Sequence, residues 1–488
     1  MPASYMPTSD DLLRFAPELI LTIMATVLMV LDPFFAKRMP KLFGHLSIVS
    51  LVVAAFAAVS AGAVPGPAYS DLLVVDDFAT FFRVLVIGIG ILAVLSSYEY
   101  LDREKAETGE YHALLLFSIV GQCVMVSGND LMMVFIGLEI SSIASYVLAG
   151  YLRDDTRNNE SALKYFLLGS FATGFLLYGI ALIYGVTATT KLDGIAAALS
   201  RPGAPGTFAM VTVAAALMFV GLAFKVSGAP FQIWAPDVYQ GAPAPVSAFM
   251  ATAPKAAAFA IFLRIFLTAF PQISNAWQPL IWISALLSMT IGNFAALTQT
   301  NLKRMLAYSS IAHAGYLLVA LAAKSEIGTA AAMFYLAAYA LMNVGAFAVV
   351  IHIGGKSERH VQIDDLAGLA RRQPGTAAML SIFLLSLIGV PLTGGFFGKF
   401  YIFRAAIESN LIWLSVLGLL NSAVAAYYYL RLMVVMYFQE PGETTKNLEP
   451  LTPGLRAAMV LSAAGTFLLG ILPGTVLSLA QRSTTFVK

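Results

Sequence analysis

The chain has 488 residues, of which 59% are apolar and only 11% are charged, whereas a soluble domain carries about 25% charged residues. A net charge of +2 gives no reason to expect a nucleic-acid partner. A single cysteine, Cys123, excludes a disulfide framework, a zinc site and a protein-held iron–sulfur cluster. The mean hydropathy of +0.80 instead indicates a chain that lies mostly within a lipid bilayer.

A spanning helix needs about 20 mostly apolar residues, and fourteen stretches of the sequence qualify. In chain order they are 12–33, 43–63, 78–98, 111–128, 130–151, 162–187, 208–228, 245–270, 277–298, 303–322, 327–353, 376–404, 410–438 and 455–478. The sequence therefore predicts an all-α polytopic membrane protein. Two of these helices are predicted to be broken, the seventh near Pro230 and the twelfth at Pro391, Gly394 and Gly395. Such breaks persist in a bilayer only where protein or a wet cavity satisfies the freed backbone groups.

The basic residues in the loops orient this chain. Counted alternately from the first helix, the odd loops hold fifteen Lys and Arg residues, and the even loops with the C-terminal tail hold six. The positive-inside rule then places the odd loops in the cytoplasm and both termini in the periplasm. We read no removable signal peptide at the N-terminus. The polar linker 354–375 is predicted to be a cytoplasmic surface element.

Basic residues within the predicted spans need an explanation, because a charge at the bilayer centre is expensive. Arg14 and Arg83 lie near helix ends, where a long side chain can reach the interface. Arg264 and Arg431 lie a turn or two from helix ends, and we expect structural pairing or the same reach to the interface.

A smaller group of ionisable residues lies deeper or beside the breaks. Glu139 is near the middle of the fifth helix, Lys225 is beside the break of the seventh, Lys255 is well inside the eighth, and Lys399 follows the break of the twelfth. Auxiliary polar residues are His313, Ser309 and Ser310 in the tenth helix, and Lys164, four residues after Glu160, where an ordinary ion pair is the simpler reading.

Two interpretations of the deep residues compete. They could form buried ion pairs that pin helices together, or they could form a proton relay. Burial disfavours the charged form of a lysine and a nearby carboxylate favours it, so lysines in this setting can take up or release protons as their surroundings change. Broken helices add exposed backbone groups at the same depth, as ion sites in transporters do. A glutamate and three lysines favour the relay.

Redox and hydrolytic motifs are missing from the sequence. It contains no GxxxxGK[ST] phosphate loop, no HExxH and no nucleophile constellation. We therefore expect no cofactor or metal in this chain, and any redox chemistry to belong to partner proteins.

The two predicted breaks lie five helices apart. Helices 4–8 (residues 111–270) and 9–13 (residues 277–438) place their charges in corresponding members, and five is an odd number, so the two units are expected to be inverted repeats. Residues 1–110 then form three N-terminal helices, and residues 439–488 form a cytoplasmic loop and helix 14.

At this point the sequence resembles a known family, the antiporter-like membrane subunits of respiratory complex I. The segment 224–247 (FKVSGAPFQIWAPDVYQGAPAPVS) looks like that of the subunit N branch, whereas the sister subunits M and L diverge after the tryptophan. The start of helix 6 (Glu160–Tyr165) and the segment Gly389–Lys399 also match the subunit N pattern.

The resemblance implies a function. Electrons would pass from NADH to quinone through flavin and iron–sulfur clusters held by other subunits, and the released energy would drive protons through this chain in the bacterial inner membrane. Glu139 would modulate Lys225, Lys255 would connect toward the centre, and Lys399 would face the periplasmic exit. The partners would be neighbouring antiporter-like and small membrane-arm subunits and the lipid bilayer.

Two alternatives stay open. A component of a multisubunit sodium/proton antiporter, or of a related membrane-bound oxidoreductase, would share the fold and the charges, although segment 230–247 argues against the antiporter. A structural scaffold subunit would need the intramembrane charges to be inert.

Overall fold

The computed structural model describes residues 6–35, 38–201, 207–484 and 486. Residues 36–37 of the first predicted loop and the terminal residues themselves, for which a periplasmic position is predicted, lie outside the described residues.

The described residues are mostly helical. The first part of the chain forms α1 (Ser9–Arg14), α2 (Ala16–Phe35), α3 (Pro40–Gly62), a short antiparallel pair of strands β1 (Gly66–Ala68) and β2 (Leu73–Val75), α4 (Asp77–Glu104), α5 (Gly109–Ser127), α6 (Leu131–Ala149), α7 (Thr156–Thr187), α8 (Leu192–Leu199), α9 (Thr207–Val226) and α10 (Trp234–Gly241). The middle part forms α11 (Ala244–Met250), α12 (Ala253–Arg264), a π-helical turn (Ile265–Ala269), α13 (Ser274–Leu297), α14 (Leu302–Ala322) and α15 (Glu326–Gly354). The last part forms α16 (Leu369–Arg372), α17 (Pro374–Ile388), α18 (Gly394–Glu408), α19 (Ile412–Phe438), α20 (Glu443–Lys446), α21 (Pro453–Ile471) and α22 (Pro473–Arg482).

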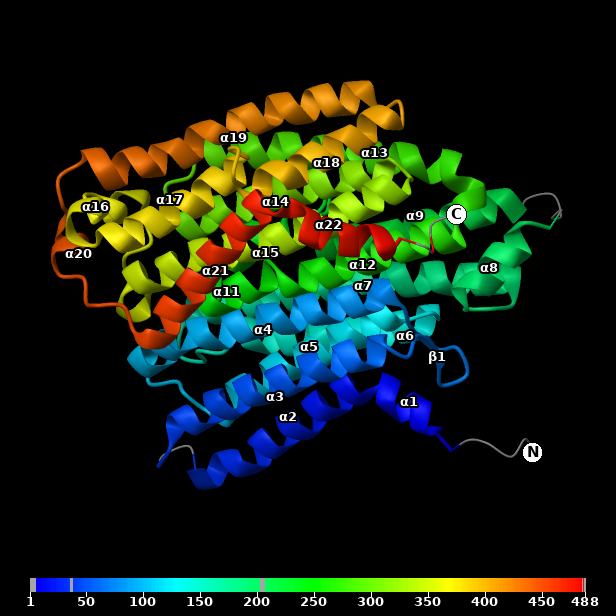
Figure 1. The fold of residues 1–488 in the computed structure, drawn as a ribbon, viewed down its shortest axis with the longest axis horizontal. Helices are drawn as coiled ribbons and strands as arrows, with labels where there is room; N and C mark the ends of the chain where they lie inside the picture. Colours follow the sequence, from blue (N-terminus) through cyan, green and yellow to red (C-terminus); the bar gives the residue numbers. More distant parts are fainter. Residues whose placement is uncertain (1–5, 36–37, 202–206, 485, 487–488) are drawn as a thin grey trace.

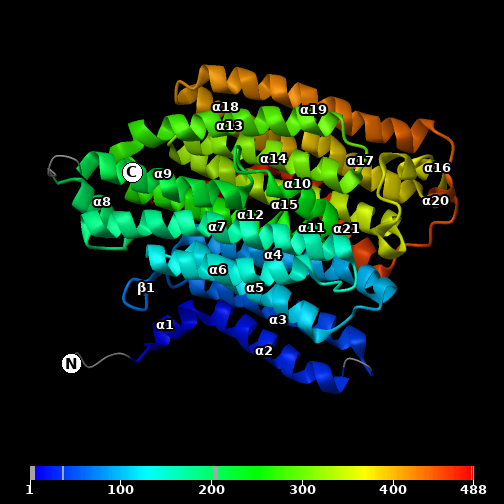
Figure 2. The ribbon, with the colours of Figure 1, turned by 180° about the vertical axis from the view of Figure 1, so that it is seen from behind.

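The long helices run side by side along one direction (Figure 1). α2 and α3 form one edge of the molecule and α19 the opposite edge, with α12, α14 and α15 in the middle in both views (Figures 1 and 2). Thirteen of the described helices are long and apolar enough to cross a membrane. The remaining predicted span is present as two half-helices, α17 and α18, so the predicted all-α membrane fold is confirmed.

The first and the last of the described helices end at the same end of the helix bundle. α1 and the C-terminal end of α22 are found there, whereas α16 and α20 lie at the other end (Figures 1 and 2). This arrangement agrees with an even number of crossings. The linker 354–375, which contains α16, lies at the end opposite the termini.

Glycines let two pairs of helices approach each other closely. A Cβ on Gly121 of α5 would lie 2.4 Å from the Ser141 nitrogen of α6, and one on Gly292 of α13 would lie 2.6 Å from the Ala312 nitrogen of α14. Close backbone approach through small residues is how membrane helices gain packing energy. The two pairs hold the first and second places of the two predicted five-helix units, but the division into repeats stays a prediction.

Three predicted helices have interruptions that we did not expect. The first is divided between α1 and α2 at Phe15, the last between α21 and α22 at Leu472, and the eighth between α11 and α12 at 251–252. In the eighth, Pro254 has no N–H to donate to the carbonyl of Met250, and the Tyr239 hydroxyl donates to that carbonyl instead, at 3.4 Å. Lys255 is therefore the third residue of α12, next to an interruption, and not well inside a continuous helix.

The expectation that Arg83 reaches the interface is wrong. Its side chain is completely buried, as is that of Glu18 on α2, and the two form a salt bridge at 2.7 Å. Arg83 also donates to the backbone carbonyl of Arg14 at 3.1 Å. Burying a charge this deeply requires a partner, and Glu18, one turn into α2, supplies it. By contrast, Arg264 pairs with Asp76 at 2.8 Å, as expected of a structural pair.

The close approach of Gly395 to the end of α17 can be tested by adding a side chain at this glycine. A Cβ on Gly395 would lie 1.8 Å from the Ser386 carbonyl oxygen, whereas one on Gly375, at the start of α17, meets nothing within 4 Å. We expect Gly395→Ala to cost about 1–3 kcal/mol of stability or more through overpacking and Gly375→Ala to change little. The measurements are the amount of assembled complex in membranes and its thermal unfolding in detergent. Equal behaviour of the two variants would contradict this reading of the break.

Candidate functional site

The break between α9 and α10 is held by protein groups. Past the end of α9, the Ala229 N–H donates to the Ser288 hydroxyl of α13 at 2.8 Å, and the Ser284 hydroxyl donates to the Ala229 carbonyl at 2.5 Å. The Trp234 indole donates to the Phe224 carbonyl at 3.0 Å. These contacts satisfy the polar groups that an unwound backbone exposes at membrane depth, and the break predicted near Pro230 is confirmed.

Lys225 lies in the last turn of α9, directly before this break, and is only 6% exposed. Its amine lies 5.4 Å from the ring centroid of Tyr146 and 5.3 Å from that of Tyr165, which are cation–π distances. Glu139 lies seven residues before Tyr146 on α6, two turns along the same face. A Glu139 carboxylate oxygen is buried and makes no hydrogen bond among the described residues. Among the described residues, Lys225 therefore lies beside two aromatic rings and forms no direct salt bridge.

Lys255 is the second buried lysine. Its amine donates to the Ser310 carbonyl of α14 at 3.1 Å and also to the Ser310 hydroxyl. Lys255 lies in the first turn of α12, directly after the interruption at 251–252, and its long side chain reaches this serine. Lys255 and Ser310, two of the residues singled out in the sequence, therefore lie in direct contact.

His313 lies one turn along α14 from Ser309 and Ser310. Its Nε2 lies 3.2 Å from the Tyr429 hydroxyl of α19, and that hydroxyl also bonds the Ser309 hydroxyl. Its Nδ1 bonds the Tyr335 hydroxyl of α15. A serine, two tyrosines and a histidine thus form a continuous hydrogen-bonded group, each member of which can donate and accept.

Lys399, on α18, is the last member of the row that Lys225, Lys255, His313 and Lys399 form. Its amine donates to the carbonyls of Leu387 and Ile388, both at 2.9 Å, and to the Ser422 hydroxyl of α19 at 2.8 Å. The two carbonyls are those freed at the C-terminal end of α17, where the helix dipole favours a cation. Gly389, with φ +95°, ends α17 and leaves room for the lysine side chain. All three donors of the ammonium group are therefore used.

Tyr316 of α14 connects the last two parts of the row. Its ring centroid lies 5.6 Å from the His313 ring and 4.7 Å from the Lys399 amine. Successive turns of α14 thus carry Ser310 beside Lys255, then His313, then Tyr316 beside Lys399.

Lys164 lies apart from this row. Its side chain is 41% exposed and pairs with Glu160 at 2.7 Å, the ordinary pair expected from the spacing. It also pairs with Asp237 of α10 at 2.8 Å, which in turn binds Arg304 at 2.7 Å. Glu160, Lys164 and Asp237 line a pocket of about 220 Å³.

Sequence reasoning missed the tyrosines. No tyrosine is among the residues singled out from the sequence, yet Tyr146, Tyr165, Tyr316, Tyr335 and Tyr429 all contact the candidate residues. The available signal was position, because a buried tyrosine hydroxyl usually needs a hydrogen-bond partner and these tyrosines lie within predicted spans.

Comparison with known proteins places this geometry in a family. The family model described as NADH:quinone oxidoreductase/Mrp antiporter, TM, matches residues 128–425. NADH-quinone oxidoreductase subunit N 1 of Solibacter usitatus is 66% identical over 488 residues, covering all of both chains. The chain belongs to the NADH-quinone oxidoreductase subunit N family. Subunit N of Rhodospirillum rubrum, 41% identical over 468 residues, covers 95% of each chain.

Solved structures agree with the subunit N assignment. A chain of respiratory complex I from Thermus thermophilus is 35% identical, has a TM-score of 0.81, and is matched over 95% of this chain and 99% of its own length. A chain of the Mrp complex from Dietzia has a TM-score of 0.85 at 20% identity, covering 97% of each chain, which shows a shared fold alone.

The serine contacts at the α9–α10 break predict a loss of stability. In Ser288→Ala the buried Ala229 N–H loses its acceptor, which costs about 1–3 kcal/mol. Ser96→Ala is the matched control, because the buried Ser96 hydroxyl bonds only a carbonyl of its own helix. We expect Ser288→Ala to lower the thermal unfolding temperature of the purified complex more than Ser96→Ala does. An equal shift would mean that Ser288 does not hold the break.

Proposed function

We propose that this chain is a proton-translocating membrane-arm subunit of an NADH–quinone oxidoreductase, driven by quinone reduction in other subunits. Protons pass along Glu139, Lys225, Lys255 and Lys399, with His313, Ser309 and Ser310 as auxiliary members. The observation that carries this proposal is the position of the three buried lysines. Each lies beside an interruption of its helix, and Lys255 and Lys399 lie at the two ends of a stretch of α14 whose Ser309 and His313 are hydrogen-bonded to the Tyr429 hydroxyl.

A purely structural role would pair these amines with carboxylates. Among the described residues, Lys255 and Lys399 instead bind hydroxyls and neutral carbonyls, and Lys225 lies over aromatic rings. Their charge is therefore only partly compensated. An amine held in this way can lose its proton at a modest cost when its surroundings change, which a firmly ion-paired lysine cannot. The Glu18–Arg83 pair is the structural contrast within the same chain.

The proposal extends to the assembly. NADH, flavin, iron–sulfur clusters and quinone belong to partner subunits, and this chain contacts neighbouring antiporter-like and small membrane subunits. Its place is the bacterial inner membrane, with both termini in the periplasm. The bundle end that carries α16 and Lys164 then faces the cytoplasm. Lys164 lies at that end as a surface contributor to the relay.

The sodium/proton antiporter alternative rests on shared fold. The Mrp chain is similar in structure but only 20% identical, whereas the subunit N relatives reach 66%. No residue of the described site specifically favours sodium, so the oxidoreductase subunit is the better supported function.

The coupling of Glu139 and Lys225 is the test of the relay. Glu139→Gln and Lys225→Ala should each reduce proton pumping and quinone-linked turnover more than they reduce assembly. Since each residue acts through the other, the double variant should cost less than the sum of the two single effects, by about 0.5–3 kcal/mol. Pumping is measured in membrane vesicles, with complex content determined separately.

Arg153→Ala is the control for these variants, because the Arg153 side chain is 80% exposed and remote from the row. It should pump as the wild type does. Wild-type pumping by Lys225→Ala, or strictly additive losses in the double variant, would refute the coupled pair.

A further inference from the structure

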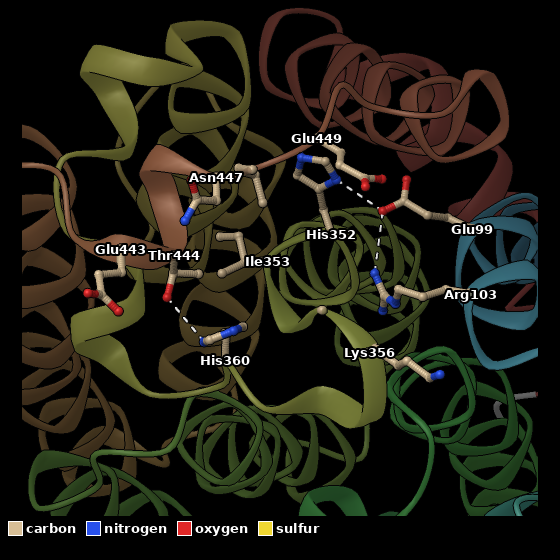
Figure 3. A pocket seen from close by; sticks show the side chains of 12 residues that line it. Glu99, Arg103, His352, Ile353, Lys356, His360, Glu443, Thr444, Asn447 and Glu449 are labelled. Atoms are coloured by element: carbon tan, nitrogen blue, oxygen red, sulfur yellow. Dashed lines mark hydrogen bonds and ion pairs between the residues drawn. The ribbon is translucent and has the colours of Figure 1, made fainter.

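A polar pocket lies at the end of the bundle opposite the termini. It has a volume of about 510 Å³ and lies between the ends of α4 and α15 and the segment that joins α19 to α21 (Figure 3). On one wall, His352 in the last turn of α15 points toward Glu99 of α4, and Arg103 lies on the other side of that carboxylate (Figure 3). The proton relay uses none of these residues.

His352 makes one hydrogen bond from each ring nitrogen. Its Nδ1 lies 3.0 Å from a Glu99 carboxylate oxygen, and its Nε2 lies 3.0 Å from the Gln373 amide oxygen. The orientation of the Gln373 amide is determined by its neighbours, because its nitrogen donates to the Glu449 carbonyl at 2.8 Å and its oxygen accepts from Thr376 at 3.0 Å. Both ring nitrogens thus face acceptors, which is the pattern of a doubly protonated imidazole.

Gln373 directly precedes α17. That helix begins at Pro374, and the side chain of its N-cap residue, Gln373, makes no hydrogen bond to the backbone N–H groups of the first turn. The Gln373 amide therefore holds the start of α17 through its bonds to His352 and to Glu449. Glu99 extends the tie to the start of α21, because it accepts from the Thr452 hydroxyl at 2.9 Å.

The other end of α17 holds Lys399. This helix has 15 residues, which corresponds to a rod of about 22 Å. The carbonyls of Leu387 and Ile388 at its far end accept two of the three hydrogen bonds of the Lys399 amine. A displacement of the start of the rod along its axis would therefore change the position of these acceptors around the amine.

We propose that His352 is a positioning residue for Lys399, which ties the start of α17 to α4 and thereby sets where the α17 carbonyls lie around the Lys399 amine. This inference rests on the proposed function, since it concerns a member of the relay. Without the imidazole, Gln373 keeps its bonds to Thr376 and Glu449 but is no longer joined to Glu99 of α4.

Other charged groups line the same pocket as His352. From α4 these are Glu99 and Arg103, from the segment after α15 they are Lys356 and His360, and from the segment between α19 and α21 they are Glu443 and Glu449. Arg103 lies 3.7 Å from the same carboxylate that His352 binds. The variants below therefore change His352 alone and leave this set intact.

The experiment uses the assembled complex in inverted membrane vesicles, with NADH and a soluble quinone. The measured quantity is the ratio of proton pumping to turnover. His352→Gln, which cannot donate to both Glu99 and Gln373, should lower this ratio about twofold or more. His352→Lys, which keeps donors for both acceptors, should keep the wild-type ratio.

His360→Gln is the matched control. His360 lines the same pocket, but its side chain is 46% exposed and bonds Thr444 rather than Gln373. It should show the wild-type ratio of pumping to turnover. The proposal is overturned if His352→Gln keeps the wild-type ratio, or if His352→Lys behaves like His352→Gln.

A second measurement separates this inference from the relay itself. Hydrogen–deuterium exchange of residues 374–388 in the assembled complex should be faster in His352→Gln and in Gln373→Ala than in the wild type. It requires no proton pumping. If Lys399→Ala pumps normally, the proposal that Lys399 belongs to the relay is refuted. The exchange rates still decide whether His352 holds α17. Unchanged exchange in both variants would overturn the tie.

Discussion

A lysine amine buried in a bilayer needs acceptors, and a helix interrupted in a bilayer frees carbonyls that need donors. In this chain the two requirements meet. The amine of Lys399 takes up the last carbonyls of α17. The α17–α18 break and Lys399 are therefore interdependent, because either one alone would leave buried polar groups without partners. Lys255 differs, since it binds a serine within the continuous helix α14, and Lys225 differs, since aromatic rings surround its amine.

This constraint explains why small and hydroxyl-bearing residues gather around the interruptions. Ser284 and Ser288 meet the unwound backbone at Ala229, and the Ser386 hydroxyl accepts from the Gly395 N–H at 3.1 Å. Protein groups thus do at membrane depth what water does for a loop at the surface. The same arrangement of helices persists in the Mrp chain at 20% identity, so the architecture tolerates wide changes of sequence.

Hydropathy was enough to locate the spans, because each needs a long apolar stretch, and the turn-forming residues around Pro230 and Pro391 revealed two breaks. The interruption before Lys255 was missed, since the residues around it remain apolar and small and only Pro254 marks it. Arg83 was misread because nearness to a helix end does not reveal what the neighbouring helix presents. Hydrogen bonds such as that of His313 to Tyr429 join residues more than a hundred positions apart. No local pattern could have shown them.

The Glu18–Arg83 salt bridge has a consequence for biosynthesis. α2 leaves the ribosome and enters the translocon before α4 has been made, so for that interval Glu18 has no cation beside it. An isolated carboxylate resists the hydrocarbon region, and α2 must wait near the headgroups or carry a proton until α4 arrives. The two helices are thus obliged to complete their integration together. Without Arg83, α2 would keep an unpaired carboxylate, so the chain would integrate poorly and be degraded before it could fold.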